Sequence, residues 1–304
     1  MIGVIPWVGG LINGKTLNTS DPAVVRVESR KTYRFRIISP SAFYPLEFSI
    51  DGHQFDVISA DGSNVVKSGP YDYLNIHGGE RYDILFNATA ASGSRFWMRA
   101  RTQEKSKPWD QVLAILSYGD NATTPLPSQD LYKGNITGTR YVNCFHDINK
   151  DCVPADSLLA LPSEAQSVPS PDVTANLHLK FIHGPLISGV RFAEPETPPI
   201  FSNGSATALP GVWPCPLNIT YDGCASQFGC NCTQVIDLKY NQQVRLVIDN
   251  AWPTTKTGVT GVHPFHLHGH KFSVLGLGYN GNYTDQLLNT VNPSLRDNII
   301  IPAG

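Results

Sequence analysis

Four of the nine histidines stand within eight consecutive residues, and side chains of this type and spacing can hold metal ions. Imidazole nitrogen is a ligand for zinc, copper, iron and nickel alike. On an extended strand alternate side chains share a face, so His266 and His268 would point the same way with rings roughly 7 Å apart, which suits neighbouring metal ions. Pro264 interrupts the hydrogen bonding of a strand and lets His263 turn toward a second, separate site. His270 has the parity of His266 and His268, and parity alone does not exclude it as a ligand.

The alternative interpretation of this segment is a solvent-facing, histidine-rich strand without metal. Against it, Val262, Phe265, Leu267 and Phe272 make the segment apolar, and buried imidazoles there need partners or metal to compensate them. The sequence contains no H-E-x-x-H pattern, which would indicate a zinc hydrolase. We therefore predict a metal site and leave the metal open at this point. The remaining histidines are isolated, which is more typical of hydrogen-bonding or surface residues: His53, His77, His146, His178 and His183.

The elements that must position these histidines are predicted to be β-strands. Apolar and polar residues alternate almost continuously from Pro22 to Tyr118, and the alternation resumes at Leu177. A period of two is typical of strands with one face on a core, and turn signals such as Asp61-Gly62 end the runs. No segment shows a helical period over a dozen residues. We predict an all-β protein built as antiparallel sandwiches or small barrels.

Length and composition favour two domains. The chain has 304 residues, and domains average ~150 residues. The first domain is predicted at 1–125, a proline-rich linker at 126–172 and the second domain at 173–304. The formal net charge of −2, with both signs scattered, argues against a nucleic-acid partner. No apolar run reaches the ~18 residues of a membrane-spanning helix, so we expect no membrane span in this chain.

Cysteines and glycosylation sequons indicate an oxidising, secretory environment. The even number of cysteines predicts three disulfides, including a Cys144–Cys152 bridge that closes a loop in the linker. A zinc site is the alternative, although it would more usually show paired C-x-x-C knuckles. The N-terminal residues do not resemble a secretory signal, which leaves an unusual export route or a chain that begins partway into a longer one. The cysteines are Cys144, Cys152, Cys215, Cys224, Cys230 and Cys232, and the eight Asn-x-Ser/Thr sequons begin at Asn18, Asn87, Asn121, Asn135, Asn203, Asn218, Asn231 and Asn282.

The histidine-rich segment GVHPFHLHGHKFSVLGLG resembles the third copper-binding motif, H-P-x-H-L-H-G-H, of the multicopper oxidases, a family that includes laccases, ascorbate oxidases and ferroxidases. RDNIIIPAG is similar to the arginine–aspartate strand that follows this motif in the family. LINGK and the run YRFRIIS…FSIDGHQFDVISADG…GERYDILF are similar to the second cupredoxin domain of laccase-like members. The resemblance implies two cupredoxin-like Greek-key domains, the second and most of the third of a three-domain enzyme, with the third truncated at its C-terminus.

The resemblance also implies a cofactor and site residues. His263 would be a ligand of type 1 copper, His266 of type 2 copper and His268 of the type 3 pair, whereas His270 is not usually a ligand in the family. Such enzymes take single electrons from a small-molecule reductant, often a phenol, and reduce O₂ to water. Laccase-like members often place a carboxylate near the type 1 histidine to accept the phenolic proton. Asp56 or Asp61 could hold that place, although an aspartate before glycine in a turn is more often structural.

The chain departs from the family pattern in its ligand content. A blue copper site needs two imidazoles and a thiolate, and the trinuclear cluster of the family needs eight imidazoles, which this chain cannot supply. No H-W-H-G or H-C-H-x-x-x-H motif occurs, and no cysteine follows Cys232. We therefore expect a piece of a longer secreted oxidase that is inactive alone. The alternative hypothesis is a secreted, glycosylated cupredoxin-like binding or structural module without catalytic copper.

Overall fold

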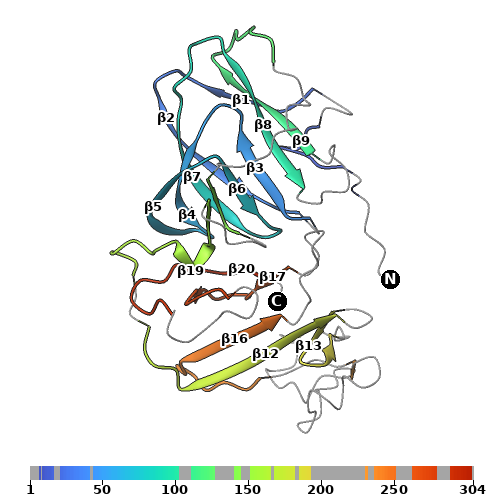
Figure 1. The fold of residues 1–304 in the computed structure, drawn as a ribbon, viewed down its shortest axis with the longest axis vertical. Coiled ribbons are helices and arrows are strands. Elements are labelled where there is room, and N and C mark those ends of the chain that lie inside the picture. Colours follow the sequence, from blue (N-terminus) through green and yellow to red (C-terminus); the bar gives the residue numbers. More distant parts are fainter. Residues whose placement is uncertain are drawn as a thin grey trace. The chain divides into compact units, whose positions relative to one another are not determined.

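The regular secondary structure of the described residues is almost entirely β-strand (Figure 1). Within the described residues there are twenty strands and one short 3-10 helix, η1 (Ala155–Ser157). The predicted all-β fold class is therefore confirmed. The computed structural model describes residues 7, 9–16, 21–41, 44–102, 111–126, 140–144, 151–165, 168–181, 185–192, 230–231, 236–250, 262–278 and 288–302.

The chain divides into two compact units that do not follow the sequence order. The larger unit joins Val4–Val168 to Thr255–Pro302, and the smaller unit is built mainly from Pro169–Thr254. The histidine-rich segment therefore packs in the same unit as the N-terminal strands. The domain boundaries at 125 and 172 stay a prediction.

The larger unit contains two main sheets, one of seven strands and one of four. The seven-stranded sheet has the order β1-β9-β8-β3-β6-β10-β11, with the bounds β1 (Val24–Val27), β9 (Gln111–Tyr118), β8 (Arg95–Thr102), β3 (Leu46–Ile50), β6 (Tyr73–Ile76), β10 (Tyr141–Val142) and β11 (Cys152–Val153). The four-stranded sheet has the order β2-β7-β4-β5, with the bounds β2 (Thr32–Ile38), β7 (Arg81–Asn87), β4 (Phe55–Ala60) and β5 (Ser63–Tyr71).

Strand β7 shows how the sequence pattern places residues in the core. Tyr82, Ile84 and Phe86 are each 0% exposed, while Asp83 between them faces outward and pairs with Arg34 of β2. Full burial of an apolar side chain of this size stabilises the fold by roughly 1.5–3 kcal/mol. The period of two in the sequence therefore becomes one apolar face on the core and one polar face outside.

Two short ladders hold the histidine-rich segment. Strand β17 (His263–His266) pairs antiparallel with β20 (Asn298–Ile301), and β18 (Phe272–Ser273) pairs antiparallel with β19 (Leu295–Arg296). The isoleucines of β20 are buried. Their burial anchors β20, which in turn fixes the position of β17.

The linker prediction includes one disulfide that the structure contains. Cys144 and Cys152 are bonded, with a Cα–Cα distance of 6.0 Å and a sequence separation of 8. Next to the bridge, β10 pairs in parallel with both β6 and β11. The β10–β6 ladder therefore attaches the linker to the sheet, and the bridge closes the loop between β10 and β11. Of the other predicted disulfide cysteines, Cys215, Cys224 and Cys232 lie outside the described residues, and only the backbone of Cys230 is described, in β15 (Cys230–Asn231).

The smaller unit contains a five-stranded sheet in the order β15-β14-β13-β12-β16. Strand β12 (Val173–Phe181) pairs in parallel with β16 (Val244–Asn250), and β13 (Pro185–Ile187) and β14 (Val190–Arg191) follow beyond β12. Here the expectation of antiparallel sheets is incomplete, because β12–β16 and the β1–β9 ladder of the larger unit are parallel. Parallel partners must be joined by long crossovers, which local alternation does not reveal.

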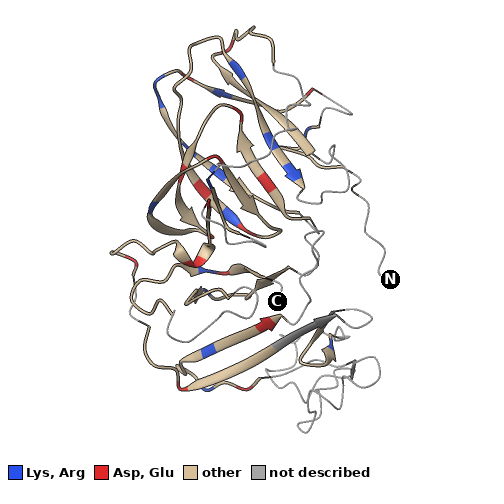
Figure 2. Ribbon diagram, in the orientation of Figure 1, with Lys and Arg blue, Asp and Glu red and all other residues tan. Residues whose placement is uncertain are grey.

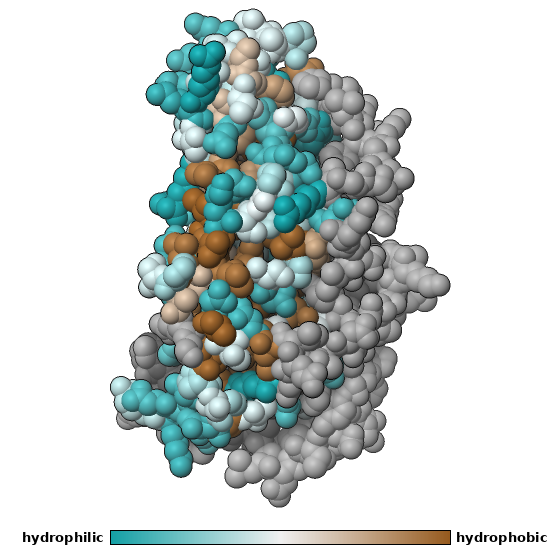
Figure 3. Space-filling model, turned by 60° about the vertical axis from the view of Figure 1, so that its left-hand side comes forward, coloured by the Kyte–Doolittle hydropathy of each residue, from teal (hydrophilic) through white to brown (hydrophobic). Residues whose placement is uncertain are grey.

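Charged and exposed apolar residues are distributed along the described strands rather than confined to one of them. Figure 2 shows Lys and Arg on the same strands as Asp and Glu. On the face in Figure 3 hydrophobic residues are interspersed with hydrophilic ones, and apolar side chains that stand out, such as Ile38 and Val291, are dispersed along the chain. Scattered apolar residues of this kind are normal on protein surfaces. Among the residues described, no helix has the length and apolar character needed to cross a membrane.

Candidate metal centre

His263 lies at the beginning of β17. It pairs with Ile301 of β20, and Pro264 follows in the same strand opposite Ile300, so the prediction that Pro264 interrupts the ladder was wrong. The proline is tolerated because, among the described strands, β17 pairs with β20 alone and its other edge needs no donor. Burial lowers the pKa of His263, because the charged imidazolium is disfavoured away from water. His263 is therefore neutral at pH 7, the form in which imidazole binds metal.

His77 lies close to His263, although the sequence gives it no partner. It is 5% exposed, and burial together with repulsion from His263 lowers its pKa to about 4. Its Nδ1 accepts a hydrogen bond of 2.7 Å from the backbone N–H of Gly78. In a neutral ring this leaves the proton on Nε2, which is the wrong tautomer for binding a metal through that atom. His77 is therefore a buried neighbour of His263, and no spacing rule in the sequence could have found it.

His266 and His268 come together in a turn. Strand β17 ends at His266, and Gly269 adopts a φ of 71° in the turn that follows. The ring centroids of the two histidines are 4.9 Å apart, with an interplanar angle of 60°. The separation is shorter than the expected spacing of an extended strand because the chain leaves the extended conformation after His266. Both side chains are exposed, and we call residues 266–270 the histidine turn.

The orientation of His266 is set by Asp297. The backbone carbonyl of Asp297 lies 2.6 Å from Nδ1 of His266, so this nitrogen donates and carries the proton. The second nitrogen, Nε2, then has its lone pair available. Ligating histidines in proteins are commonly held in this way, with the non-ligating N–H on a carbonyl or carboxylate. His266 is thus in the tautomer that a metal site requires.

Arg81 fixes the side chain of Asp297. Its two terminal nitrogens donate to the two carboxylate oxygens at 2.5 and 2.7 Å, an arrangement that joins β7 to the segment between β19 and β20. The guanidinium lowers the pKa of Asp297, so this carboxylate stays ionised. The carboxylate is also 3.8 Å from Nδ1 of His266. Arg81 therefore supports the residue that orients His266.

Behind this pair lies a fully buried charge network centred on Arg296. Arg296 is 0% exposed and donates to Asp61 at 2.6 Å, to Glu80 at 3.1 Å and to the hydroxyl of Tyr82 at 3.0 Å. Burial raises the pKa of Glu80 to about 7, although Arg296 opposes the rise. The network connects β19 to strands β4 and β7. The sequence carried a weak signal for it, since an arginine beside an apolar strand such as NIII requires a buried partner.

Of the two aspartates considered as proton acceptors, Asp61 is structural. It is 0% exposed and accepts from Arg296, and from the backbone N–H groups of Arg81 at 3.0 Å and Asn298 at 3.3 Å. Asp56 instead pairs with Lys67 at 3.3 Å. Neither lines the cavity of about 360 Å³ beside the histidine turn, which is formed by Gly78, Gly79, Pro264, His266 and Asn298.

The structure brings together two of the three predicted ligands and keeps the third apart. His266 and His268 are ring neighbours, whereas His263 lies at the other end of β17 with His77. Within the part of the chain that is described, no three His, Cys, Asp or Glu side chains form a group that could enclose a metal ion. These histidines therefore provide separate, incomplete donor sets.

Comparison with known proteins shows the fold and the family of this chain. The fold resembles that of the laccase from Botrytis aclada with a TM-score of 0.66 and 22% identity, over 99% of this chain and 52% of that structure. This likeness confirms the predicted cupredoxin-type β fold. Two family profiles, both described as multicopper oxidase, match residues 6–121 and 201–304. The chain belongs to the multicopper oxidase family.

Curated relatives include enzymes with different names. Laccase-1 of Pleurotus ostreatus is 30% identical over 287 residues, covering 87% of this chain and 45% of the relative. The L-ascorbate oxidase of Nicotiana tabacum is 27% identical, covering 93% of this chain and 50% of the relative. The chain therefore spans about half the length of the curated relatives it matches.

Proposed function

We propose that the chain supplies copper ligands to a laccase-like oxidoreductase, which takes single electrons from a phenolic or similar reductant and reduces O₂ to water. The observation that carries this proposal is the histidine turn. There His266 holds its proton on Nδ1 against Asp297 and keeps Nε2 for a metal, beside the ring of His268. Bound copper would supply the one-electron chemistry. The residues of this chain would hold and orient the imidazoles.

The proposed ligands fall into separate centres. We assign His263 to type 1 copper, His266 to type 2 copper and His268 to the type 3 pair. The separation of His263 from the other two along β17 supports two sites, and the 4.9 Å between the rings of His266 and His268 supports neighbouring ions. Neutral imidazoles fit copper, and lowering of the His263 pKa by burial keeps that ring neutral.

The number of histidines limits how many copper ligands this chain can provide. A blue site with two imidazoles and a cluster with eight would need ten histidines, and this sequence has nine, of which five have no neighbouring histidine along the chain. The 304 residues therefore hold only part of the donor set. For the whole protein we propose a small-molecule reductant and O₂ as reactants, and a secreted location, which the Cys144–Cys152 disulfide supports.

Copper binding by the histidine turn tests the proposal. The purified 304-residue chain is titrated with Cu²⁺, and binding is followed by calorimetry and by the electron paramagnetic resonance of the bound ion. His266→Ala and His268→Ala should each weaken binding by about tenfold or more, since each removes a ligand. His270→Ala is the matched control, because His270 is an exposed histidine of the same turn with no proposed role.

Two outcomes would contradict this assignment. Equal losses in all three variants would mean nonspecific binding to surface imidazoles, and no Cu²⁺ binding by the unsubstituted chain would favour the cupredoxin-like binding module without copper. The oxidase activity has a separate test. A transcript that carries H-W-H-G and H-C-H motifs in the same reading frame would supply the remaining ligands, and a frame without them would remove the basis for activity.

A further inference from the structure

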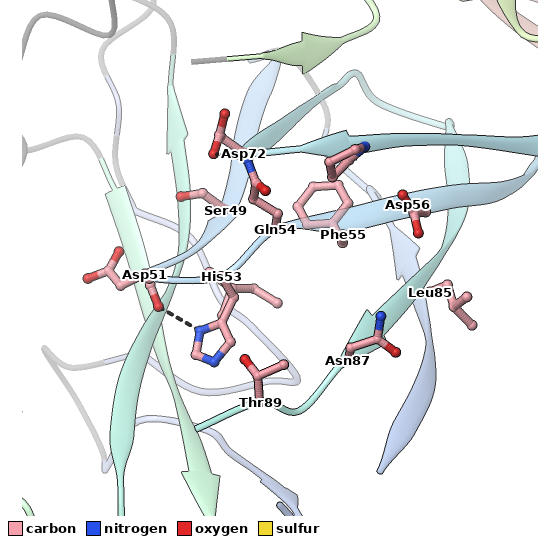
Figure 4. Close-up of a pocket in the computed structure, with 13 residues that line it drawn as sticks. Ser49, Asp51, His53, Gln54, Phe55, Asp56, Asp72, Leu85, Asn87 and Thr89 are labelled. Carbon is pink, nitrogen blue, oxygen red and sulfur yellow. Dashed lines mark hydrogen bonds between the residues drawn. The ribbon is translucent and has the colours of Figure 1, made fainter. Parts of the chain in front are cut away.

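A groove of about 650 Å³ lies in the larger unit, away from the histidine turn (Figure 4). It is bounded by the turn between β3 and β4, by residues near the start of β6 and by the end of β7. The volume is within the ~300–1,000 Å³ range of pockets that enclose small ligands. Its lining is mostly polar, and the lining residues come from three parts of the chain.

The wall of the groove includes an N-glycosylation sequon. Asn87, the last residue of β7, and Thr89 both line it, and both are exposed, while Ala88 between them is buried. Oδ1 of Asn87 accepts a hydrogen bond of 2.8 Å from the hydroxyl of Thr32. This contact fixes the amide plane and leaves Nδ2, the atom to which a glycan is attached, for modification.

The opposite wall offers hydrogen-bonding groups suited to a neutral, hydroxyl-rich ligand. In the view of Figure 4, Gln54 and Asp72 lie above Asn87 and Thr89. The Nε2 of Gln54 donates to Oδ1 of Asp72 at 2.9 Å, and the backbone N–H of Arg140 donates to Oδ2 at 2.8 Å, so each carboxylate oxygen keeps one lone pair and Gln54 keeps its amide oxygen for a ligand. Hydroxyl groups can donate to carboxylate oxygens in strong, charge-assisted hydrogen bonds.

Charged ligands fit this groove less well. The carboxylates of Asp51, Asp56 and Asp72 disfavour an anion. A cation would compete with partners already present, since Arg99 binds Asp51 through two bonds of 2.7 Å and Lys67 lies 3.3 Å from Asp56. The imidazole of His53 is also engaged at both nitrogens, by the carbonyl of Asp51 and the hydroxyl of Tyr118. It is therefore not a free metal ligand.

We propose that an N-linked glycan on Asn87 lies in this groove, so that its first sugars bind to the protein that carries them. Attachment makes the binding intramolecular. A short tether gives an effective concentration of about millimolar, so weak hydrogen bonds donated by sugar hydroxyls to Gln54 and Asp72 suffice to hold the sugar. The ordered glycan would cover the end of β7 and the turn between β3 and β4. The proposal does not depend on copper or on oxidase activity.

Asn121 provides a matched control. Asn87-Ala88-Thr89 and Asn121-Ala122-Thr123 are the same tripeptide, and Asn121 is exposed in the turn after β9 and does not line the groove. The chain is secreted from a eukaryotic host, and peptide mass spectrometry determines occupancy at both sites. An endoglycosidase is then applied to the native and to the denatured protein. We expect release from Asn87 to be about tenfold slower than from Asn121 in the native protein, and equal after denaturation.

Two sets of variants separate groove binding from other causes. Gln54→Ala changes an exposed groove residue and should bring the release rate at Asn87 up to that at Asn121. Thr89→Ala removes the glycan but keeps the Asn87–Thr32 contact, and should lower the melting temperature relative to Thr89→Ser, which keeps the sequon. The proposal is overturned if Asn87 is unmodified, if its glycan is released as fast as that of Asn121, or if Gln54→Ala leaves the rate unchanged.

Discussion

Replacing Arg296 by methionine removes a cation from two fully buried carboxylates, Glu80 and Asp61, and Asp61 keeps its 3.3 Å ion pair with Arg81. Methionine keeps much of the side-chain volume, so the main change is the loss of three hydrogen bonds, to these two acids and to Tyr82. Removing one partner of a buried ion pair costs about 3–5 kcal/mol. Because Glu80 has a pKa of about 7, it can become neutral in the variant. We therefore expect a loss near the lower end, about 3 kcal/mol.

The measurement is urea unfolding at pH 7, followed by tryptophan fluorescence. Arg34→Met is the matched control, since Arg34 pairs with Asp83 across β2 and β7 but its side chain is 46% exposed. Surface pairs of this kind contribute about 0–1 kcal/mol. A loss in Arg296→Met no larger than that in Arg34→Met would refute the conclusion that the buried network joins β19 to the β4–β7 region.

Four further outcomes are expected. Arg81→Met, which releases the carboxylate of Asp297, should weaken copper binding by the histidine turn by about tenfold in a competition titration, and unchanged affinity would contradict a supporting role. The folded-state pKa of Glu80 is raised from 4.5 to about 7, so its contribution is present below pH 4.5 and is lost as pH rises to about 7. Over that range the unfolding free energy of the unsubstituted chain should fall relative to that of Glu80→Gln. A difference between the two proteins that stays the same at every pH would argue against it. Replacing Cys144 and Cys152 together by alanine should lower the free energy of unfolding in urea by about 2.5 kcal/mol through loop-closure entropy, and an unchanged free energy would contradict a stabilising role for the bridge. The copper-loaded chain should not oxidise a diphenol, and O₂ consumption in an oxygen electrode would show that fewer imidazoles suffice.

Local patterns in the sequence predicted the strands and the chemistry of the site. The alternation in β7 places Tyr82, Ile84 and Phe86 in the core, as a period of two requires. The short separation of Cys144 and Cys152 made their disulfide predictable. The histidine-rich segment was identified from residue type and spacing alone. These features depend only on residues close together in the sequence, so they can be recognised without knowledge of the tertiary structure.

Only the tertiary structure decided which distant residues meet. Arg296 reaches Asp61 across 235 positions, and His77 lies beside His263, because the final strands return to the unit built by the first half of the chain. The orientation of His266 likewise depends on a residue distant in the sequence, because its Nδ1–H donates to the backbone carbonyl of Asp297. Such contacts follow from long crossovers and burial, which no local period encodes. The sequence thus pointed to the side chains that we propose as copper ligands, and the fold decided how they are oriented and what supports them.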